Sequence, residues 1–113
     1  MREFRHFIDD MLDAIAGIEN ALIGKTFDDY QRDWLLRLGT QRGIEIISEA
    51  SRRLPSEAKA LRMDIPWQRV SAIGNVLRHE YDSLADQVLW GVMNDELPIL
   101  KAALHEIAGS YRP

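Results

Sequence analysis

The sequence contains no cysteine among its 113 residues. A disulfide framework, a thiol nucleophile and a cysteine-based metal site are therefore excluded, and nothing in the composition requires an oxidising compartment. The sequence also lacks a glycine-rich phosphate loop and the nucleophile elbow of serine hydrolases. A catalytic site in this chain would have to use other residue types.

Long apolar runs are absent as well. The N-terminal stretch MREFRHFIDDMLDAIAG breaks its apolar residues with charged ones, so it lacks the continuous apolar segment of a signal peptide. No other stretch approaches the roughly 20 apolar residues that are needed to span a bilayer. We therefore expect a cytoplasmic protein that has no membrane partner.

Acidic residues outnumber basic ones, and the formal net charge is −4. This balance argues against a non-specific nucleic-acid binder. Residues 51–80, however, hold six bases against three acids, a local charge of +3, while the remainder carries 8 bases and 15 acids, or −7. An anion site is therefore expected in this middle third, although a solvated helix surface would have the same composition.

Apolar residues repeat every three or four positions along the chain, which is the pattern of core-facing amphipathic helices. The first predicted helix covers residues 4–23 and ends at Gly24. The second begins after Thr26, which is a suitable N-cap. Its expected apolar face consists of Tyr30, Trp34, Leu35, Leu38, Ile44, Ile47 and Leu54. Gly43 is the position where this helix is expected to bend.

Proline and serine mark the remaining predicted helices. Ser56 is the expected N-cap of a short helix, and a further helix should start near Pro66. Ser83 forms an imperfect capping pair with the acid three positions later, before a last helix that Pro98 should kink. No segment alternates with period two. The sequence therefore predicts one all-α domain, residues 1–113, built as a bundle of about five helices.

The stretch GNVLRHEYD, residues 74–82, concentrates polar chemistry near the end of the fourth predicted helix. Helical spacing places Asn75, Arg78 and His79 on one polar strip, with Tyr81 in reach. An imidazole exchanges protons near neutrality, and a guanidinium donates to phosphate oxygens, so the cluster fits phosphodiester chemistry. The alternative is an ordinary helix C-terminus, where Arg and His complement the dipole and the tyrosine is an aromatic anchor.

Other candidate residues give weaker signals. His6 and His105 lie far apart and show no paired ligand spacing, so no metal site is expected. Trp34, Trp67 and Trp90 could stack on nucleic-acid bases as single-strand binders do. Their places within apolar stripes or beside a helix start favour packing in the core or at a dimer interface instead.

The run IPWQRVSAIGNVLRHEYDSLADQVLW, followed by NDELPILKAAL, resembles the HepT family of small HEPN-fold proteins. A Pro-Trp pair, an Asn, a His-x-Tyr and a Val-x-Trp occur in the family's order, and the resemblance is best over residues 65–104. It implies a homodimeric, metal-independent endoribonuclease that needs no cofactor and acts as a toxin. The implied antitoxin is an MntA-like minimal nucleotidyltransferase, which silences such a toxin by attaching AMP to the tyrosine of His-x-Tyr.

Carried over position by position, the resemblance makes His79 the catalytic histidine and Tyr81 the AMP acceptor. Asn75 matches the polar residue that follows the family's arginine, but the arginine itself is replaced here by Gly74. Arg78 is the nearest cation in the sequence that could take its place. This departure leaves open whether the chain is a nuclease or a non-catalytic subunit of the same fold that docks a nucleotidyltransferase.

The implied chemistry assigns a role to each residue of the cluster. His79 would take the proton of the ribose 2′-hydroxyl, and the partner's His79 would protonate the leaving oxygen across a two-fold axis. Arg78 and Asn75 would stabilise the charge of the phosphorane-like transition state. Arg69 precedes His79 by ten residues, about 15 Å along a helix, which is too far to serve the His79 of the same chain. Because a two-fold dimer can bring the second copy near, Arg69 is a candidate for RNA phosphate binding across the dimer. A helical scaffold without any link to nucleic acid is a third possibility.

Overall fold

The computed structural model describes residues 2–80 and 85–111. Its long helices are α1 (Arg2–Leu22), α3 (Trp34–Ser51), α5 (Trp67–Glu80) and α7 (Leu97–Ser110). Shorter segments join them: α2 (Phe27–Arg32), α4 (Ser56–Lys59), the 3₁₀ turn η1 (Ala60–Arg62), α6 (Asp86–Gly91) and the π-helical η3 (Val92–Glu96). No strand occurs in residues 2–80 and 85–111, so the all-α prediction is confirmed.

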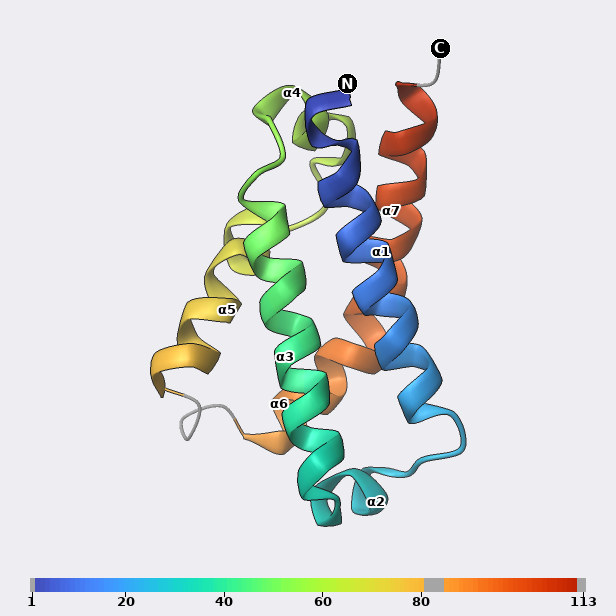
Figure 1. Cartoon of the computed structure of the whole chain (residues 1–113), viewed down its shortest axis with the longest axis vertical. Helices are drawn as coiled ribbons and strands as arrows, with labels where there is room; N and C mark the ends of the chain where they lie inside the picture. The colour runs from blue at the N-terminus through green and yellow to red at the C-terminus, as the bar shows by residue number, and fades with distance from the viewer. Residues whose placement is uncertain (1, 81–84, 112–113) are drawn as a thin grey trace.

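The long helices lie side by side along the long axis of the molecule (Figure 1). α3 packs between α1 and α5, and α7 packs against α1. α5 runs antiparallel to α3, so the start of α3 and the end of α5 lie toward the same end of the bundle. None of the described helices is both long and apolar enough to cross a membrane.

α1 forms as its sequence pattern predicts. Ile8, Met11 and Ile15 are fully buried, and Ile18 follows them on the same face at 4% exposure. The helix stops before Gly24, which has a φ of +72°. A left-handed residue at this position is the usual way to end a helix, and glycine adopts it without strain.

The second predicted helix is divided into two, and the prediction of one continuous helix is wrong. Thr26 caps α2 as expected, because its hydroxyl accepts from the Asp29 amide and the Asp29 carboxylate accepts from the Thr26 amide. Asp33 then ends α2 and also caps α3, where its carboxylate accepts from the Leu36 amide at 2.9 Å. The break sits at a residue whose short carboxylate competes with helix hydrogen bonding.

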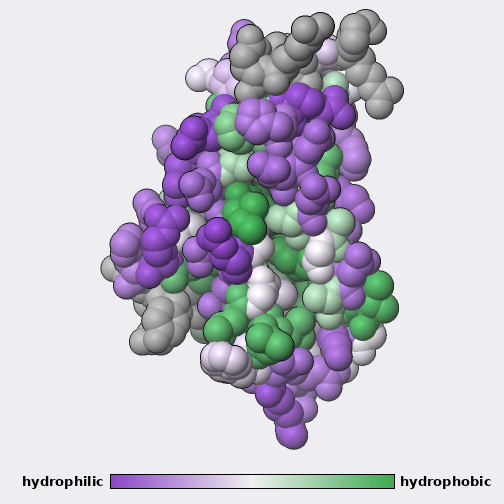
Figure 2. Space-filling model, in the orientation of Figure 1, coloured by the Kyte–Doolittle hydropathy of each residue, from purple (hydrophilic) through white to green (hydrophobic). Residues whose placement is uncertain are grey.

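This break changes which side chains reach the core. Tyr30 is buried, but Trp34, Leu35 and Leu38 are 63%, 71% and 41% exposed, so only part of the predicted apolar face reaches the core of this chain. Ile23, at 74% exposure, lines the same surface hollow as Trp34 and Leu35. We call Ile23, Trp34, Leu35 and Leu38 the apolar patch. Hydrophobic residues gather over this part of α3 in the face that Figure 2 shows.

Gly43 lies inside α3, and the bend expected there stays a prediction. The helix runs without interruption from Trp34 to Ser51. A β-carbon on Gly43 would lie 2.9 Å from Ile18 Cδ1, so the glycine allows α1 and α3 to approach closely. Its role is packing between two helices, which a single-helix reading does not reveal.

The remaining helix starts are confirmed only in part. Ser56 is the first residue of α4 and not its cap, because Pro55 occupies the N-cap position and makes no side-chain hydrogen bond there. α5 begins next to Pro66 as predicted, and the Pro66 carbonyl accepts from the Val70 amide. α6 begins after Ala85 without a side-chain cap, and Ser83 of the predicted capping pair lies outside the described residues.

The C-terminal helix changes direction ahead of Pro98, as predicted (Figure 1). The chain accommodates the proline through the π-helical segment η3, in which the Leu97 amide donates to the Val92 carbonyl five residues back. This wider turn alters the hydrogen-bond register just where proline has no amide to donate. The Asn94 side chain donates to the Trp90 carbonyl at 2.9 Å within the same stretch.

Candidate functional site

The candidate site lies on α5, whose two faces differ in character. Leu77 is buried at 3% exposure, and Val70 and Ile73 pack against the core beside it. Arg78 and His79 are exposed and form the basic last turn of the helix. Because helical amides point away from this end, both side chains also complement the partial negative charge of the helix terminus.

Three of the predicted site residues come together on this surface. Asn75 is exposed and lies one turn before Arg78 and His79 on the same helix. Their side chains are therefore accessible to a ligand that approaches the end of α5. Tyr81 lies outside the described residues, so its assignment as AMP acceptor stays a prediction.

A seam of serine hydroxyls fixes α5 against α3 next to these residues. The Ser48 hydroxyl donates to the Ser71 carbonyl at 2.9 Å and accepts from the Gly74 amide at 3.0 Å. The Ser51 hydroxyl lies 3.2 Å from that of Ser71 and donates to the Ser48 carbonyl at 2.6 Å. Ser48 and Ser51 are both fully buried, so these hydrogen bonds satisfy polar groups that water cannot reach.

Gly74 has no room for a side chain at this seam. A β-carbon at position 74 would lie 2.7 Å from Ser48 Oγ and 2.8 Å from Ser48 Cβ. An arginine here, as the family resemblance leads one to expect, would force the two helices apart or displace Ser48. The departure at Gly74 is therefore tied to the close packing of α3 and α5.

Arg52, which the sequence reasoning missed, approaches the seam from α3. Its Nη2 lies 3.6 Å from the place where a Gly74 β-carbon would be, and its Nε donates to the Ser71 carbonyl at 3.0 Å. The guanidinium is exposed. The sequence signal was the basic pair at 52 and 53, but nothing local indicates that one of these arginines reaches residues about twenty positions later.

Arg69 is placed differently from the other candidates. Its Nη2 lies 3.0 Å from the Glu96 carboxylate, and the two side chains are 57% and 42% exposed. Exposed pairs of this kind contribute little to stability and break readily. Arg69 faces the η3 segment and not the last turn of α5, so its role in RNA binding stays a prediction.

The tryptophans divide into two groups. Trp67 donates to the carbonyls of Lys59 and Arg62 at 3.2 and 3.0 Å, and the Trp90 ring packs 5.5 Å from that of Tyr30. Packing is thus confirmed as the role of these two tryptophans. Trp34, by contrast, belongs to the exposed apolar patch.

The two other histidines are exposed on separate helices, His6 on α1 and His105 on α7. Within residues 2–80 and 85–111, no group of three or more His, Asp or Glu side chains is arranged to hold a metal ion. The prediction that the chain needs no metal remains untested.

Shifted pKa values occur at positions away from the last turn of α5. Burial raises the pKa of the Tyr30 phenol. Hydrogen bonds from the Thr26 backbone and side chain lower the pKa of Asp29, and the hydrogen bonds from Arg62 lower that of Asp64. These shifts arise from burial, a helix cap and an ion pair, which are structural roles.

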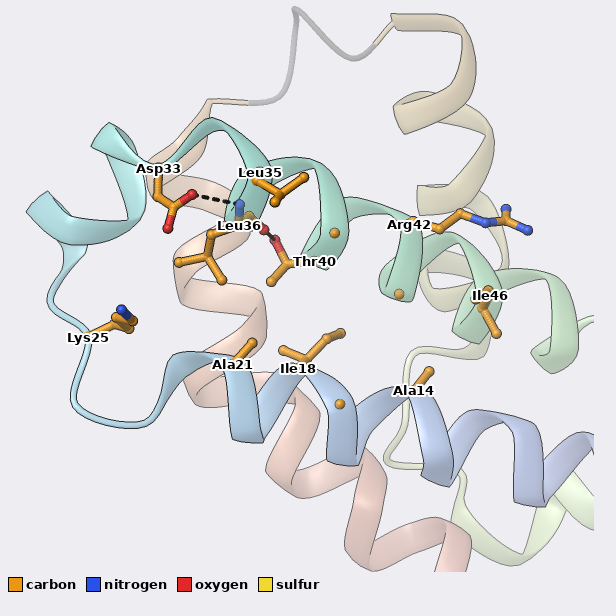
Figure 3. Close-up of a pocket in the computed structure, with 13 residues that line it drawn as sticks. Ala14, Ile18, Ala21, Lys25, Asp33, Leu35, Leu36, Thr40, Arg42 and Ile46 are labelled. Atoms are coloured by element: carbon orange, nitrogen blue, oxygen red, sulfur yellow. Dashed lines mark hydrogen bonds between the residues drawn. The ribbon is translucent and has the colours of Figure 1, made fainter.

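A groove of about 630 Å³ lies between α1 and α3 (Figure 3). Small residues such as Gly17, Gly39 and Ala21 line it, together with Ile18 and Leu35. Figure 3 shows the Arg42 side chain pointing away from α1. No residue of α5 lines this groove, so the hollow is separate from the polar cluster of Asn75, Arg78 and His79.

Comparisons with known proteins agree on one family. The family model described as "Ribonuclease HepT-like" matches residues 11–107. "Probable ribonuclease HepT" from Thermococcus cleftensis is 29% identical over 106 residues, which cover 94% of this chain and 96% of the relative. A protein of Caldanaerobacter subterraneus named as a candidate RNase is 27% identical over 107 residues, covering 95% and 96% of the two chains.

A third relative, from Methanocaldococcus jannaschii and also named as a candidate RNase, is 23% identical over 100 residues, with 88% and 92% of the two chains covered. No solved structure matches the chain significantly. The match to the family model covers most of the chain and includes every predicted site residue. The chain belongs to the HepT-like ribonuclease family.

Proposed function

We propose that this protein is a metal-independent endoribonuclease in which His79 is the general base. The observation that carries the proposal is the exposed pair of Arg78 and His79 on the last turn of α5, one turn after Asn75. Membership of a ribonuclease family supports the same chemistry. An imidazole and a guanidinium that both face solvent on one helix end can reach an RNA strand together.

The reaction is an attack of the ribose 2′-hydroxyl on the adjacent phosphorus. The neutral imidazole of His79 takes the hydroxyl proton as the new oxygen–phosphorus bond forms, and the bond to the 5′-oxygen breaks. That leaving oxygen takes a proton from an acid, for which the partner's His79 is the candidate. Positioned proton transfer of this kind accelerates a reaction by about 10²- to 10⁴-fold. Arg78 and Asn75 donate to the phosphate oxygens, where negative charge grows.

The proposed assembly is a two-fold homodimer that contacts its partner through the apolar patch. Trp34 and Leu35 are more than half exposed, and a surface aromatic with an aliphatic neighbour is typical of an interface centre. The patch lies toward the same end of the bundle as the end of α5 (Figure 1). A symmetric contact there brings two copies of His79 toward one shared cleft.

We further propose that the enzyme is the cytoplasmic toxin of a toxin–antitoxin pair. Its antitoxin is an MntA-like nucleotidyltransferase that transfers AMP to the hydroxyl of Tyr81, two residues after His79. The added phosphate places negative charge beside Arg78, so it competes with RNA for that cation. Intact-mass measurement after co-expression with such an enzyme tests this step, and an unchanged mass of the wild-type chain would refute it.

The nuclease proposal is tested with purified protein in EDTA. Wild type and His79→Ala are incubated with total RNA and with a defined oligoribonucleotide, and fragments are resolved on denaturing gels. Cleavage by wild type and its loss in the variant are expected, with 2′,3′-cyclic phosphate ends on the fragments. Equal cleavage by both proteins, or cleavage by neither, would refute the proposal.

A second function is a non-catalytic subunit that docks a nucleotidyltransferase. The close contact between Gly74 and Ser48 favours it, because this contact leaves no space for the arginine that the family has at this position. A growth assay separates the two functions. Induction of the chain without a nucleotidyltransferase should arrest growth if it is a toxin, whereas normal growth with demonstrated soluble expression would support the docking subunit.

A further inference from the structure

We propose that Arg52 binds an RNA phosphate at the seam between α3 and α5, and that it supplies from α3 the positive charge that Gly74 cannot supply from α5. The inference rests on the proposed function, because it names a further residue that holds the substrate. Three observations carry it: where the guanidinium lies, how it is oriented, and which carboxylates engage the other cations around it.

The guanidinium occupies the space that a residue 74 side chain would enter. Arg52 Nη2 lies 3.6 Å from the place of a Gly74 β-carbon, and among the described residues outside the surrounding turns of α5 only the Ser48 side chain lies closer. Gly74 precedes His79 by five residues, which corresponds to about 7.5 Å along the helix axis. The positive charge of Arg52, which extends from the C-terminal end of α3, therefore lies beside α5, the helix that carries His79.

One hydrogen bond orients the Arg52 side chain without neutralising it. Its Nε donates to the Ser71 carbonyl at 3.0 Å, and that carbonyl also accepts from the buried Ser48 hydroxyl. A carbonyl carries no net charge, so the positive charge of Arg52 is retained. Since Nε is the donor in use, the fork of terminal N–H groups is directed away from the carbonyl, where it can donate to a phosphate.

Other cations of the basic middle third are engaged differently. Arg62 pairs with Asp64 at 2.8 Å and Glu106 at 2.6 Å, and Arg69 pairs with Glu96 at 3.0 Å. Among the described residues, no carboxylate pairs with Arg52 in this way. Arg52 therefore keeps its positive charge beside Gly74 and the Ser71 carbonyl of α5.

Arg53 is the natural control for Arg52. It is the next residue in the chain, it is exposed like Arg52, and it carries the same charge. Its guanidinium lies over the Phe7 ring, 5.8 Å from the centroid, and thus faces α1 and not the seam. An effect that depends only on total charge should be equal for the two arginines, whereas a phosphate site at the seam requires Arg52 alone.

The test measures binding of a fluorescein-labelled, mixed-sequence 2′-O-methyl oligoribonucleotide, which cannot be cleaved because it lacks the attacking hydroxyl. Full-length wild type, Arg52→Gln, Arg52→Lys and Arg53→Gln are titrated over a series of salt concentrations. Glutamine retains a donor for the Ser71 carbonyl but has no charge. We expect about tenfold weaker binding for Arg52→Gln, partial recovery for Arg52→Lys and wild-type binding for Arg53→Gln.

The salt dependence gives a readout that a merely structural role would not change. Loss of one phosphate contact should reduce the slope of log K against log[salt] by about 0.7 for a single strand. Circular dichroism and thermal melting establish that each variant is folded. Wild-type affinity and slope in folded Arg52→Gln would overturn the inference, as would an equal loss in Arg53→Gln.

Cleavage of the matching unmodified RNA separates this inference from the proposed function. If wild type cleaves, His79→Ala does not, and Arg52→Gln binds and cleaves normally, only the Arg52 inference fails. If wild type binds through Arg52 but does not cleave, the inference holds and the nuclease proposal fails. If wild type binds no RNA at any salt concentration, both fail.

Discussion

Ser48 and Gly74 hold α3 and α5 at contact distance, since the Gly74 amide donates to the Ser48 hydroxyl at 3.0 Å across the helix pair. The same hydroxyl donates to the Ser71 carbonyl, so one buried side chain connects two turns of α5 to α3. The position of the proposed catalytic surface relative to α3 therefore depends on a glycine and a serine that are not themselves exposed.

Introducing at position 74 the arginine that the family resemblance leads one to expect should be harmful. Gly74→Arg, and already Gly74→Ala, places a β-carbon within 2.8 Å of Ser48, so something must shift. We expect the free energy of unfolding to fall by about 1–3 kcal/mol for the alanine variant, as for other overpacked sites. Urea unfolding measures the loss, and the arginine variant should cleave RNA no better than wild type.

Gly39→Ala is the matched control for this prediction. Gly39 lies inside α3, in its first half, with nothing within 4 Å of the added β-carbon. Alanine there should stabilise the helix by about 0.4–1 kcal/mol, because it restricts the unfolded chain without a clash. Equal effects of the two alanine substitutions would contradict the close contact at Gly74.

Tyr30→Phe should leave the protein as stable as wild type or make it more stable. The Tyr30 hydroxyl is buried beside the Thr40 side chain, but among the described residues it makes no hydrogen bond of regular geometry, so its removal costs at most a weak interaction. An unpartnered buried hydroxyl carries a desolvation penalty of about 1–3 kcal/mol. Denaturant unfolding at pH 7 makes the comparison, and a loss above 1 kcal/mol would point to a hidden partner.

The same tyrosine predicts a loss of stability in alkali. Burial raises the pKa of Tyr30 in the folded state above its ordinary value of 10.0. The unfolded chain therefore releases this proton first, so stability is fully present below about pH 10 and is lost as the pH rises through the folded-state pKa. Unfolding at pH 9, 10 and 11 should show a steeper decline for wild type than for Tyr30→Phe, and identical slopes would contradict the assignment.

Leu35→Glu should weaken the proposed homodimer. Leu35 is 71% exposed and belongs to the apolar patch, so glutamate can be accommodated in the monomer but would bury a charge in a symmetric contact. Analytical ultracentrifugation should show a dissociation constant raised by at least tenfold. Met63→Glu, which changes an exposed residue on the turn before α5, serves as the control and should leave the dimer intact.

Asp33→Ala should destabilise the α2–α3 junction by about 1 kcal/mol, the usual cost of losing an N-cap. The carboxylate of Asp33 accepts from the Leu36 amide at 2.9 Å, and alanine removes this acceptor. Asp33→Asn keeps an acceptor oxygen and should retain most of the stability. Thermal melting compares the three proteins, and a loss in Asp33→Asn as large as in Asp33→Ala would show that charge and not capping is the cause.

Local signals predicted most helix boundaries of this fold. Gly24, Thr26 and Pro66 act through their own backbone or side-chain chemistry, which the sequence reveals directly. Asp33 was missed because an apolar repeat continues across it, and the exposure of Trp34 then followed from the unpredicted break. Periodicity indicates that a helix is present, but the face that is buried depends on the packing of neighbouring helices.

The sequence likewise predicted the arrangement of the candidate residues only where they lie on one helix. Asn75, Arg78 and His79 share one helix, so their grouping follows from spacing alone. Arg52 and Gly74 are brought together by the packing of two helices, and no local pattern indicates a contact between residues so far apart in the chain. Spacing along one helix thus predicts which α5 residues share a surface, but not which α3 residue packs beside them.

The π-helical segment η3 contains an extra residue that allows the chain to accommodate Pro98. A π turn contains one more residue than an α turn would need, and here that residue lies within Val92–Glu96, directly ahead of Pro98. Removing a residue from this segment would restore ordinary register and bring the Pro98 ring against a carbonyl one turn earlier. We therefore expect that homologues with one residue fewer in the segment that corresponds to Val92–Glu96 also lack the proline that corresponds to Pro98.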